Sequence, residues 1–213
     1  MNKLLTSVFA VAVASVTAFP AQAQEVKGDA KAGETKIAMC IGCHGIQGYQ
    51  ATFPEVYKVP KISGQGAKYI ASSLAAYKKG DRKHPTMRGI ADSLSDQDMA
   101  DVAAYYEQSG QTGAAAAAKA SREPSAQVAE LLKKGACVSC HGENFAKPID
   151  PSYPKLGGQH ADYLYVALKA YHTVNNPNIG RANPIMAAQV QAFTPKELKQ
   201  LAQHIATLPS DLK

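Results

Sequence analysis

Apolar side chains recur every three or four residues in segments that come in pairs, one in each half of the chain. The clearest pair is Met99, Val102, Ala103 and Tyr106 in the first half and Leu198, Leu201, Ala202 and Ile205 in the second. Residues 67–79 and 161–172 show the same spacing of Ala, Leu and Tyr. These intervals place apolar residues on one face of a helix, and no segment alternates as a strand would. The pattern predicts an all-α fold, with about three to four helices in each half.

Polar residues that favour helix N-termini stand just before these segments. Four of them mark the starts of the first and last helices of the two halves: Asp29, Ser95, Ser125 and Thr194. The first helices are expected to run without a break into Cys40 and Cys137. Ser95 and Thr194 each have an acidic residue three positions later, which is the pattern of a capping box.

The two halves repeat each other beyond the helices. Residues 60–65, Pro-Lys-Ile-Ser-Gly-Gln, match residues 154–159, Pro-Lys-Leu-Gly-Gly-Gln. In the same order, Tyr69 matches Tyr163, and the Pro-x-Met sequence that ends at Met87 matches the one that ends at Met186. A repeat of about a hundred residues indicates one duplicated domain. Residues 110–124 are rich in Ala, Gly and Ser and lack an apolar pattern, so we expect a linker there, between domains at 24–109 and 125–213.

Residues 1–23 have the features of a secretory signal peptide. Lys3 precedes an apolar stretch over 4–19, and residues 21–23, Ala-Gln-Ala, fit a small-x-small cleavage site. We expect cleavage after Ala23 and export to the periplasm; the alternative is a retained N-terminal anchor. The formal net charge is +6, but no run of basic residues occurs, so nucleic acid is not an expected partner.

All four cysteines belong to two Cys-x-x-Cys-His motifs, at 40–44 and 137–141. This is the attachment pattern of c-type haem, because cysteines three apart on a helix can both reach one edge of the porphyrin. The candidate residues are Cys40, Cys43 and His44 in the first motif and Cys137, Cys140 and His141 in the second. Two disulfides or a shared zinc site would leave the histidines unexplained. The motifs therefore predict two haem c groups, attached covalently, with each histidine bound to iron.

The repeat also suggests the second ligand of each iron. Met87 and Met186 occupy equivalent positions two residues after a proline, and we expect both in stiff loops before the last helix. A thioether there would close the sixth coordination position, which is the arrangement of electron carriers. The rival ligand for the first haem is His84, whose counterpart in the repeat is Asn183.

Other repeated residues are candidates for contacts around the haems. A histidine that binds iron usually donates its second ring N–H to a carbonyl, and Pro60 and Pro154 are the candidate acceptors for His44 and His141. Tyr69 and Tyr163 are candidates either for bonding a haem propionate or for packing.

With two Cys-x-x-Cys-His motifs, two Pro-Lys-(Ile/Leu)-x-Gly-Gln segments and two Pro-x-Met sequences, the chain resembles the dihaem cytochrome c4 family over almost its whole mature length. The resemblance implies two class I cytochrome c domains related by a pseudo-twofold axis, with the propionate edges of the haems facing each other. It implies the axial pairs His44 with Met87 and His141 with Met186. Residues 49–59 and 180–183 depart from the usual pattern of the family.

The resemblance further implies a periplasmic carrier, sometimes loosely attached to the membrane, that passes electrons from a quinol-oxidising complex toward a terminal oxidase. We expect a monomer that is not an enzyme and that takes up one electron at each haem. One alternative is the cytochrome subunit of a periplasmic dehydrogenase, for example in sulfur-compound oxidation. A dihaem peroxidase is disfavoured, because peroxide needs an open coordination position and the two Pro-x-Met sequences match.

Overall fold

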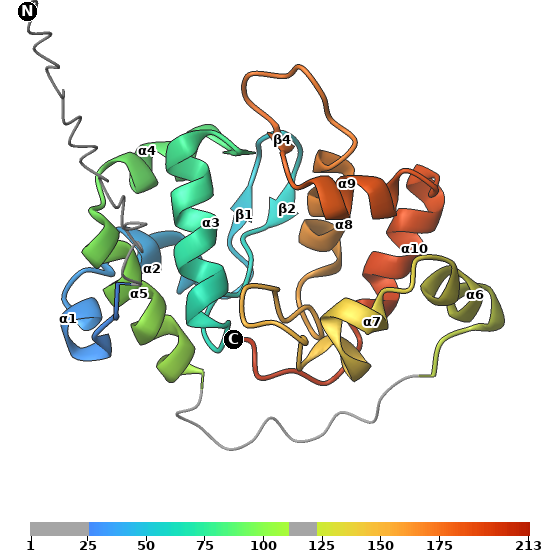
Figure 1. The fold of residues 1–213 in the computed structure, drawn as a ribbon, viewed down its shortest axis with the longest axis horizontal. Helices are drawn as coiled ribbons and strands as arrows, with labels where there is room; N and C mark the ends of the chain where they lie inside the picture. The colour runs from blue at the N-terminus through green and yellow to red at the C-terminus, as the bar shows by residue number, and fades with distance from the viewer. Residues whose placement is uncertain (1–25, 111–122) are drawn as a thin grey trace, which may run out of the picture.

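The structure is a computed structural model that describes residues 26–110 and 123–213. Two groups of helices lie side by side, one from each half of the chain (Figure 1). The elements of the N-terminal group are α1 (Ala30–Glu34), α2 (Ala38–His44), β1 (Gln50–Ala51), β2 (Tyr57–Lys58), α3 (Ala67–Lys79), β3 (Arg82–Lys83), α4 (Pro85–Asp92) and α5 (Asp96–Ser109). Those of the C-terminal group are α6 (Ala126–Lys134), α7 (Val138–His141), a 3₁₀ turn (Glu143–Phe145), α8 (Ala161–Ala170), β4 (Gly180–Arg181), α9 (Pro184–Val190) and α10 (Pro195–Ile205).

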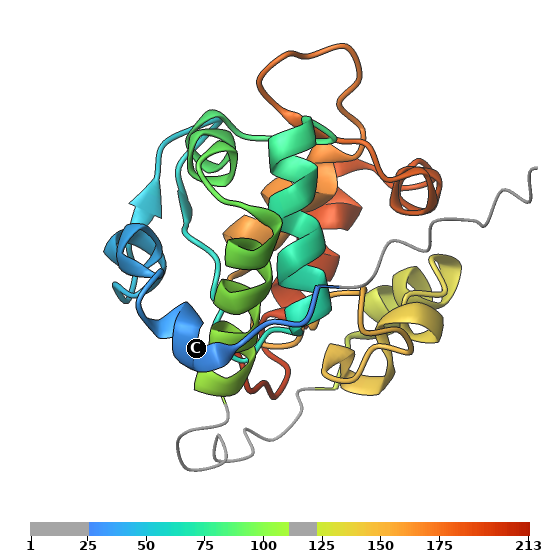
Figure 2. The ribbon, with the colours of Figure 1, turned by 60° about the vertical axis from the view of Figure 1, so that its left-hand side comes forward.

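The two apolar stripes form the cores, as predicted. Helix α3 runs along α5 (Figure 2), and the α5 stripe packs with Ile70 and Leu74 of α3. In the other group α8 packs on α10, where Leu198 is only 2 % exposed. Burying a leucine to this extent contributes about 1.5–3 kcal/mol. The capping boxes predicted at Ser95 and Thr194 are both present.

The first helix of each half is shorter than expected. Asp29 caps α1 as predicted, but α1 ends at Glu34, where the Thr35 hydroxyl donates to the carbonyl of Ala32, and α2 starts again at Ala38. In the second half α6 ends before Gly135, and a positive φ of 45° at Ala136 separates it from α7. Each haem motif therefore lies on a short helix separate from the helix that precedes it.

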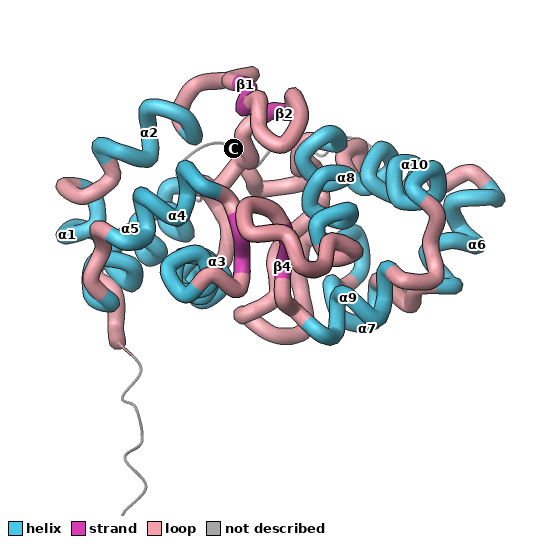
Figure 3. The backbone as a smooth tube through the Cα atoms, turned by 90° about the horizontal axis from the view of Figure 1, so that it is seen from above, coloured by secondary structure: helices cyan, strands magenta, loops and turns pink. Residues whose placement is uncertain are grey.

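The predicted all-α fold is confirmed, since helices dominate the structure and its strands are few and short. β1 pairs with β2 inside the N-terminal group, and β3 pairs with β4 across the two groups. Each strand has only two residues, which is too short for the sequence to show alternation. Figure 3 shows β3 and β4 side by side between the two sets of helices. In their antiparallel register Arg82 lies opposite Arg181.

The repeated Pro-Lys-x-x-Gly-Gln segments hold the two groups together by exchanging hydrogen bonds. The Gln65 side chain donates to the backbone carbonyl of Lys155 at 2.9 Å and accepts from the Lys155 backbone N–H at 2.9 Å. Gln159 does the same with Lys61, at 2.8 and 3.0 Å. The two lysine ammonium groups donate to backbone carbonyls of the opposite segment. We call these four residues, Lys61, Gln65, Lys155 and Gln159, the Gln–Lys clasp.

Residues 49–59, one of the segments that depart from the family pattern, also join the two groups. They form the β1–β2 hairpin, which packs against α8. The backbone N–H of Lys58 donates to Asp162 at 3.0 Å, and Glu55 makes an ion pair with Lys169. The hairpin therefore adds to the contact between the two halves.

Candidate haem sites

The two Cys-x-x-Cys-His motifs lie on short helices, one in each group. Cys40, Cys43 and His44 belong to α2, whereas Cys137 caps the start of α7. All four cysteines are half-exposed free thiols, so no disulfide joins them. Within residues 26–110 and 123–213, no three His, Cys, Asp or Glu side chains converge as a metal site would need.

Both motif histidines are held by the carbonyl groups that the sequence suggested. The Nδ1 atom of His44 lies 2.8 Å from the carbonyl oxygen of Pro60, and that of His141 lies 3.3 Å from the carbonyl oxygen of Pro154. A carbonyl can only accept, so Nδ1 carries the proton and Nε2 keeps its lone pair. Burial lowers the pKa of both histidines, which favours this neutral form. A neutral imidazole with a free Nε2 is the state in which histidine binds iron.

The prediction that Met87 and Met186 lie in loops is wrong. They lie in the first turns of α4 and α9. Pro85 and Pro184 start these helices, since a proline at the first helical position loses no hydrogen bond. Both methionines contact the apolar core of their own group. Met99, in contrast, is a core residue that is 3 % exposed, as the α5 stripe predicted.

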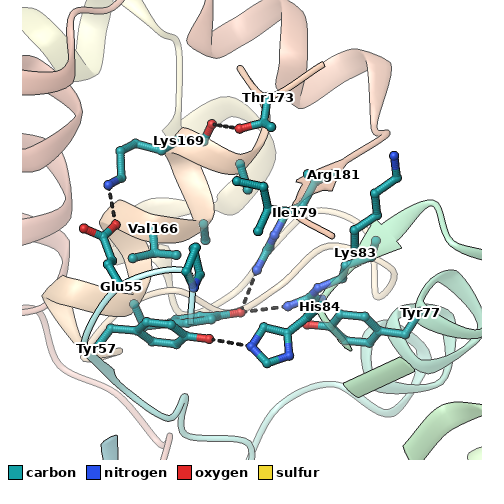
Figure 4. Close-up of a pocket in the computed structure, with 16 residues that line it drawn as sticks. Glu55, Tyr57, Tyr77, Lys83, His84, Val166, Lys169, Thr173, Ile179 and Arg181 are labelled. Atoms are coloured by element: carbon teal, nitrogen blue, oxygen red, sulfur yellow. Dashed lines mark hydrogen bonds and ion pairs between the residues drawn. The ribbon is translucent and has the colours of Figure 1, made fainter. Parts of the chain in front are cut away.

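The residue three positions before each methionine caps its helix. The Asn183 side chain accepts from the backbone N–H of Met186 at 2.9 Å, and Nδ1 of His84 accepts from that of Met87 at 3.4 Å. The other ring nitrogen of His84 lies 3.1 Å from the Tyr57 hydroxyl (Figure 4). Both nitrogens of His84 are thus engaged within the protein, which disfavours it as the rival ligand. Sequence reasoning missed this role because His and Asn look unrelated, although the capping position repeats.

Tyr69 and Tyr163 contact two arginines that sequence reasoning did not single out. Arg82 donates to the Tyr69 hydroxyl at 3.2 Å and to the Tyr163 hydroxyl at 2.8 Å. Arg181 also donates to the Tyr163 hydroxyl, at 3.0 Å. Each arginine precedes a Pro-x-Met methionine by five residues, and this equal spacing was a signal available in the sequence. The side chains of Arg82 and Arg181 line a cavity of about 320 Å³ between the N-terminal and C-terminal groups of helices (Figure 4).

The residues fit haem c in both halves. Each site offers two free thiols, a neutral histidine oriented by a proline carbonyl, and a thioether in an apolar setting. Within the described part of the chain, no helix is both long and apolar enough to cross a membrane.

Comparison with known proteins agrees with this arrangement. The cytochrome c family model matches twice, at residues 30–109 and 125–209. Cytochrome c4 of Stutzerimonas stutzeri is 34 % identical over 98 % of this chain and 100 % of its own length. The thiosulfate dehydrogenase electron acceptor of S. stutzeri strain A1501 is 30 % identical over 88 % of each chain. The crystal structure of reduced recombinant cytochrome c4 from Pseudomonas stutzeri superposes with a TM-score of 0.60 at 29 % identity, covering 85 % of this chain and 99 % of that one.

Two helical units that each present a haem motif define a tandem cytochrome, and the chain belongs to the cytochrome c family. Its full-length match to cytochrome c4 confirms the resemblance to the dihaem cytochrome c4 family. The chain is therefore a dihaem electron carrier with covalently bound haem c, whose partners are redox proteins. The predicted limits of the domains stay predictions, and residues 1–23 lie outside the described part of the chain.

Proposed function

We propose that each haem is closed on both faces by this chain, with His44 and Met87 on one iron and His141 and Met186 on the other. The thioether bonds would form at the cysteines of the two motifs: Cys40, Cys43, Cys137 and Cys140. The observation that carries this proposal is the shared construction of α4 and α9. In each, a capping side chain and a proline fix the first helical turn around one methionine.

Six-coordinate iron suits electron transfer and leaves no position for a substrate. Each haem would take up and release one electron, and haem bound by His and Met has a fairly positive reduction potential. We propose that the mature protein, cleaved after Ala23, works in the periplasm between a quinol-oxidising complex and a terminal oxidase. Docking would use small, weak surfaces, as is usual for redox encounters.

The ligands can be tested by spectroscopy on the purified holoprotein. Met87→Ala and Met186→Ala should each remove about half of the sulfur-to-iron charge-transfer absorption of the ferric protein. The control is Met99→Leu, which places in α5 the residue found at the matching position in α10, and it should leave that absorption unchanged. Undiminished absorption in both alanine variants would contradict methionine ligation. A high-spin signal in the wild type, or ready binding of carbon monoxide at both haems, would favour the peroxidase alternative.

A second function is favoured by one relative. The S. stutzeri protein named as a thiosulfate dehydrogenase electron acceptor matches this chain over 88 % of its length. We propose, as the alternative, that the chain accepts electrons from a periplasmic dehydrogenase that oxidises sulfur compounds. Rapid-mixing kinetics should compare its reduction by a purified thiosulfate dehydrogenase with that by a quinol-oxidising complex. The faster donor at equal concentration and equal ionic strength identifies the function.

A further inference from the structure

Tyr106 carries a buried hydroxyl group that has no partner in the described part of the chain. The residue belongs to the apolar stripe of α5 and is only 4 % exposed. Its hydroxyl oxygen is buried and makes no hydrogen bond with any group in residues 26–110 and 123–213. Buried polar groups without a partner cost free energy, so nearly all of them are paired in native proteins. The orphaned hydroxyl therefore indicates a partner that the polypeptide does not supply.

The position of Tyr106 is fixed by its surroundings. Its backbone carbonyl accepts hydrogen bonds from the backbone N–H of Gly64 at 2.7 Å and from the Ser109 hydroxyl at 3.0 Å. Its ring packs edge-on against that of Tyr105, with 5.3 Å between the ring centres. Because cores are densely packed, a tyrosine held in this way keeps its hydroxyl pointing in one direction.

The thiol of Cys40, the first cysteine of the first haem motif, is a polar group close to this hydroxyl. Cys40 packs against the core cluster that contains Tyr106. Burial raises the pKa of Cys40, and the nearby Tyr106 hydroxyl offsets part of this effect. Burial, and to a smaller extent Cys40, raise the pKa of Tyr106, so the phenol keeps its proton and can donate a hydrogen bond. The orphaned hydroxyl therefore lies beside a sulfur atom that becomes a thioether when haem is attached.

The second haem motif has an aliphatic side chain at the matching position. Ile205 on α10 is the counterpart of Tyr106 in the repeat, and it is 6 % exposed. Cys137, the counterpart of Cys40, packs against the core cluster that contains Ile205. The first cysteine of each motif thus meets the same part of its own core, but a phenol in one half is replaced by isoleucine in the other. The two haem sites should therefore differ in one polar contact at this point.

We propose that the Tyr106 hydroxyl donates a hydrogen bond to the thioether sulfur that Cys40 forms with the first haem, and that this bond raises the reduction potential of that haem. The inference rests on the proposed function, since it needs haem attached at Cys40. A thioether sulfur has no proton and can only accept, although weakly. The hydrogen end of the O–H dipole is positive, and ferric iron carries one more positive charge than ferrous iron. The dipole therefore favours the ferrous state of the first haem, and Ile205 has no such effect on the second.

The test is a redox titration of the holoprotein, followed by the sulfur-to-iron charge-transfer absorption. In a Met186→Ala background this absorption reports the first haem alone, and in a Met87→Ala background it reports the second. Tyr106→Phe keeps the ring and removes only the hydroxyl. It should shift the ferric–ferrous equilibrium of the first haem toward ferric by about threefold, which is about 28 mV for a one-electron couple, and leave the second haem unchanged. The matched control is Tyr105→Phe, the neighbouring tyrosine on α5, which should change neither potential.

A second variant separates the hydrogen bond from packing. Placing 3-fluorotyrosine at position 106 nearly preserves the shape of the side chain and makes the phenol a stronger donor, so the potential of the first haem should rise above that of the wild type. This variant also decides the question if Tyr106→Phe does not fold.

Three results would overturn the inference. They are an unchanged potential of the first haem in Tyr106→Phe, an equal shift at both haems, and a potential that falls with fluorotyrosine as it does with phenylalanine. Failure of the proposed function would show separately in the wild type, as a haem missing from the intact mass or as missing charge-transfer absorption.

Discussion

From the Gln–Lys clasp we predict how much one glutamine side chain contributes to the free energy of unfolding through the contact between the two domains. Gln159→Ala removes two hydrogen bonds to the backbone of Lys61 and a third to the backbone N–H of His160. Gln159 is 4 % exposed, so water cannot readily replace these bonds. Each net hydrogen bond contributes about 1 kcal/mol, so the free energy of unfolding should fall by about 2–3 kcal/mol.

Guanidinium unfolding of the holoprotein, followed by haem absorbance and by circular dichroism, measures this loss. The matched control is Gln203→Ala, an exposed glutamine on α10, which should change the free energy of unfolding by less than about 0.5 kcal/mol. If Gln159→Ala behaves like Gln203→Ala, the clasp does not stabilise the contact between the domains. The double variant Gln159→Ala/Gln65→Ala shows whether the two glutamines act independently. If they do, their effects on the free energy of unfolding add.

Three further variants test local features of the fold. Gly33→Ala should lower the free energy of unfolding by about 1–3 kcal/mol, because a Cβ atom there would lie 2.2 Å from the carbonyl oxygen of Asp101; chemical denaturation measures it. Asn183→Ala removes the cap of α9, so it should cost about 1 kcal/mol and weaken the charge-transfer absorption of the haem assigned to Met186 on heating. Asp101→Asn should flatten the acid dependence of stability. The hydrogen bond from Lys36 holds the pKa of Asp101 below its usual range. The ionised Asp101 carboxylate therefore stabilises the fold fully above about pH 4, and this stabilisation is lost as the pH falls further.

Each of these expectations has an outcome that contradicts it. An unchanged unfolding midpoint in Gly33→Ala would mean that α1 moves away from α5 without cost. For Asn183→Ala, Gln191→Ala at the exposed C-terminal end of α9 serves as the control, and equal effects would remove the argument from capping. If Asp101→Asn loses as much stability as the wild type between pH 5 and pH 2, other carboxyl groups govern acid unfolding.

Local features of the structure were predictable from the sequence, because they depend on residues close together in the chain. The helical stripes, the capping boxes and the carbonyl acceptors of the motif histidines follow from such short spacings. The helical position of Met87 was also within reach, since a proline at the first turn followed by a methionine suits a helix start as well as a loop.

Contacts between the halves were not predictable in this way. The pairing of Arg82 with Arg181 and the clasp of Gln65 and Gln159 join residues about a hundred positions apart. The repeat showed that these residues recur, but a recurring residue can contact its own domain or the other one. Only the packed arrangement shows that each copy of the motif bonds the other copy.

The reciprocal form of the clasp bears on how such a molecule could arise. Each half carries both the glutamine that gives hydrogen bonds and the lysine backbone that receives them. An ancestral chain with only one half would therefore be self-complementary, and two copies could associate as an isologous homodimer. Gene fusion would then have changed a concentration-dependent association into a permanent one, and the two copies could diverge in sequence. His84 and Asn183 are an example, since they are different residues that both cap the helix of a methionine.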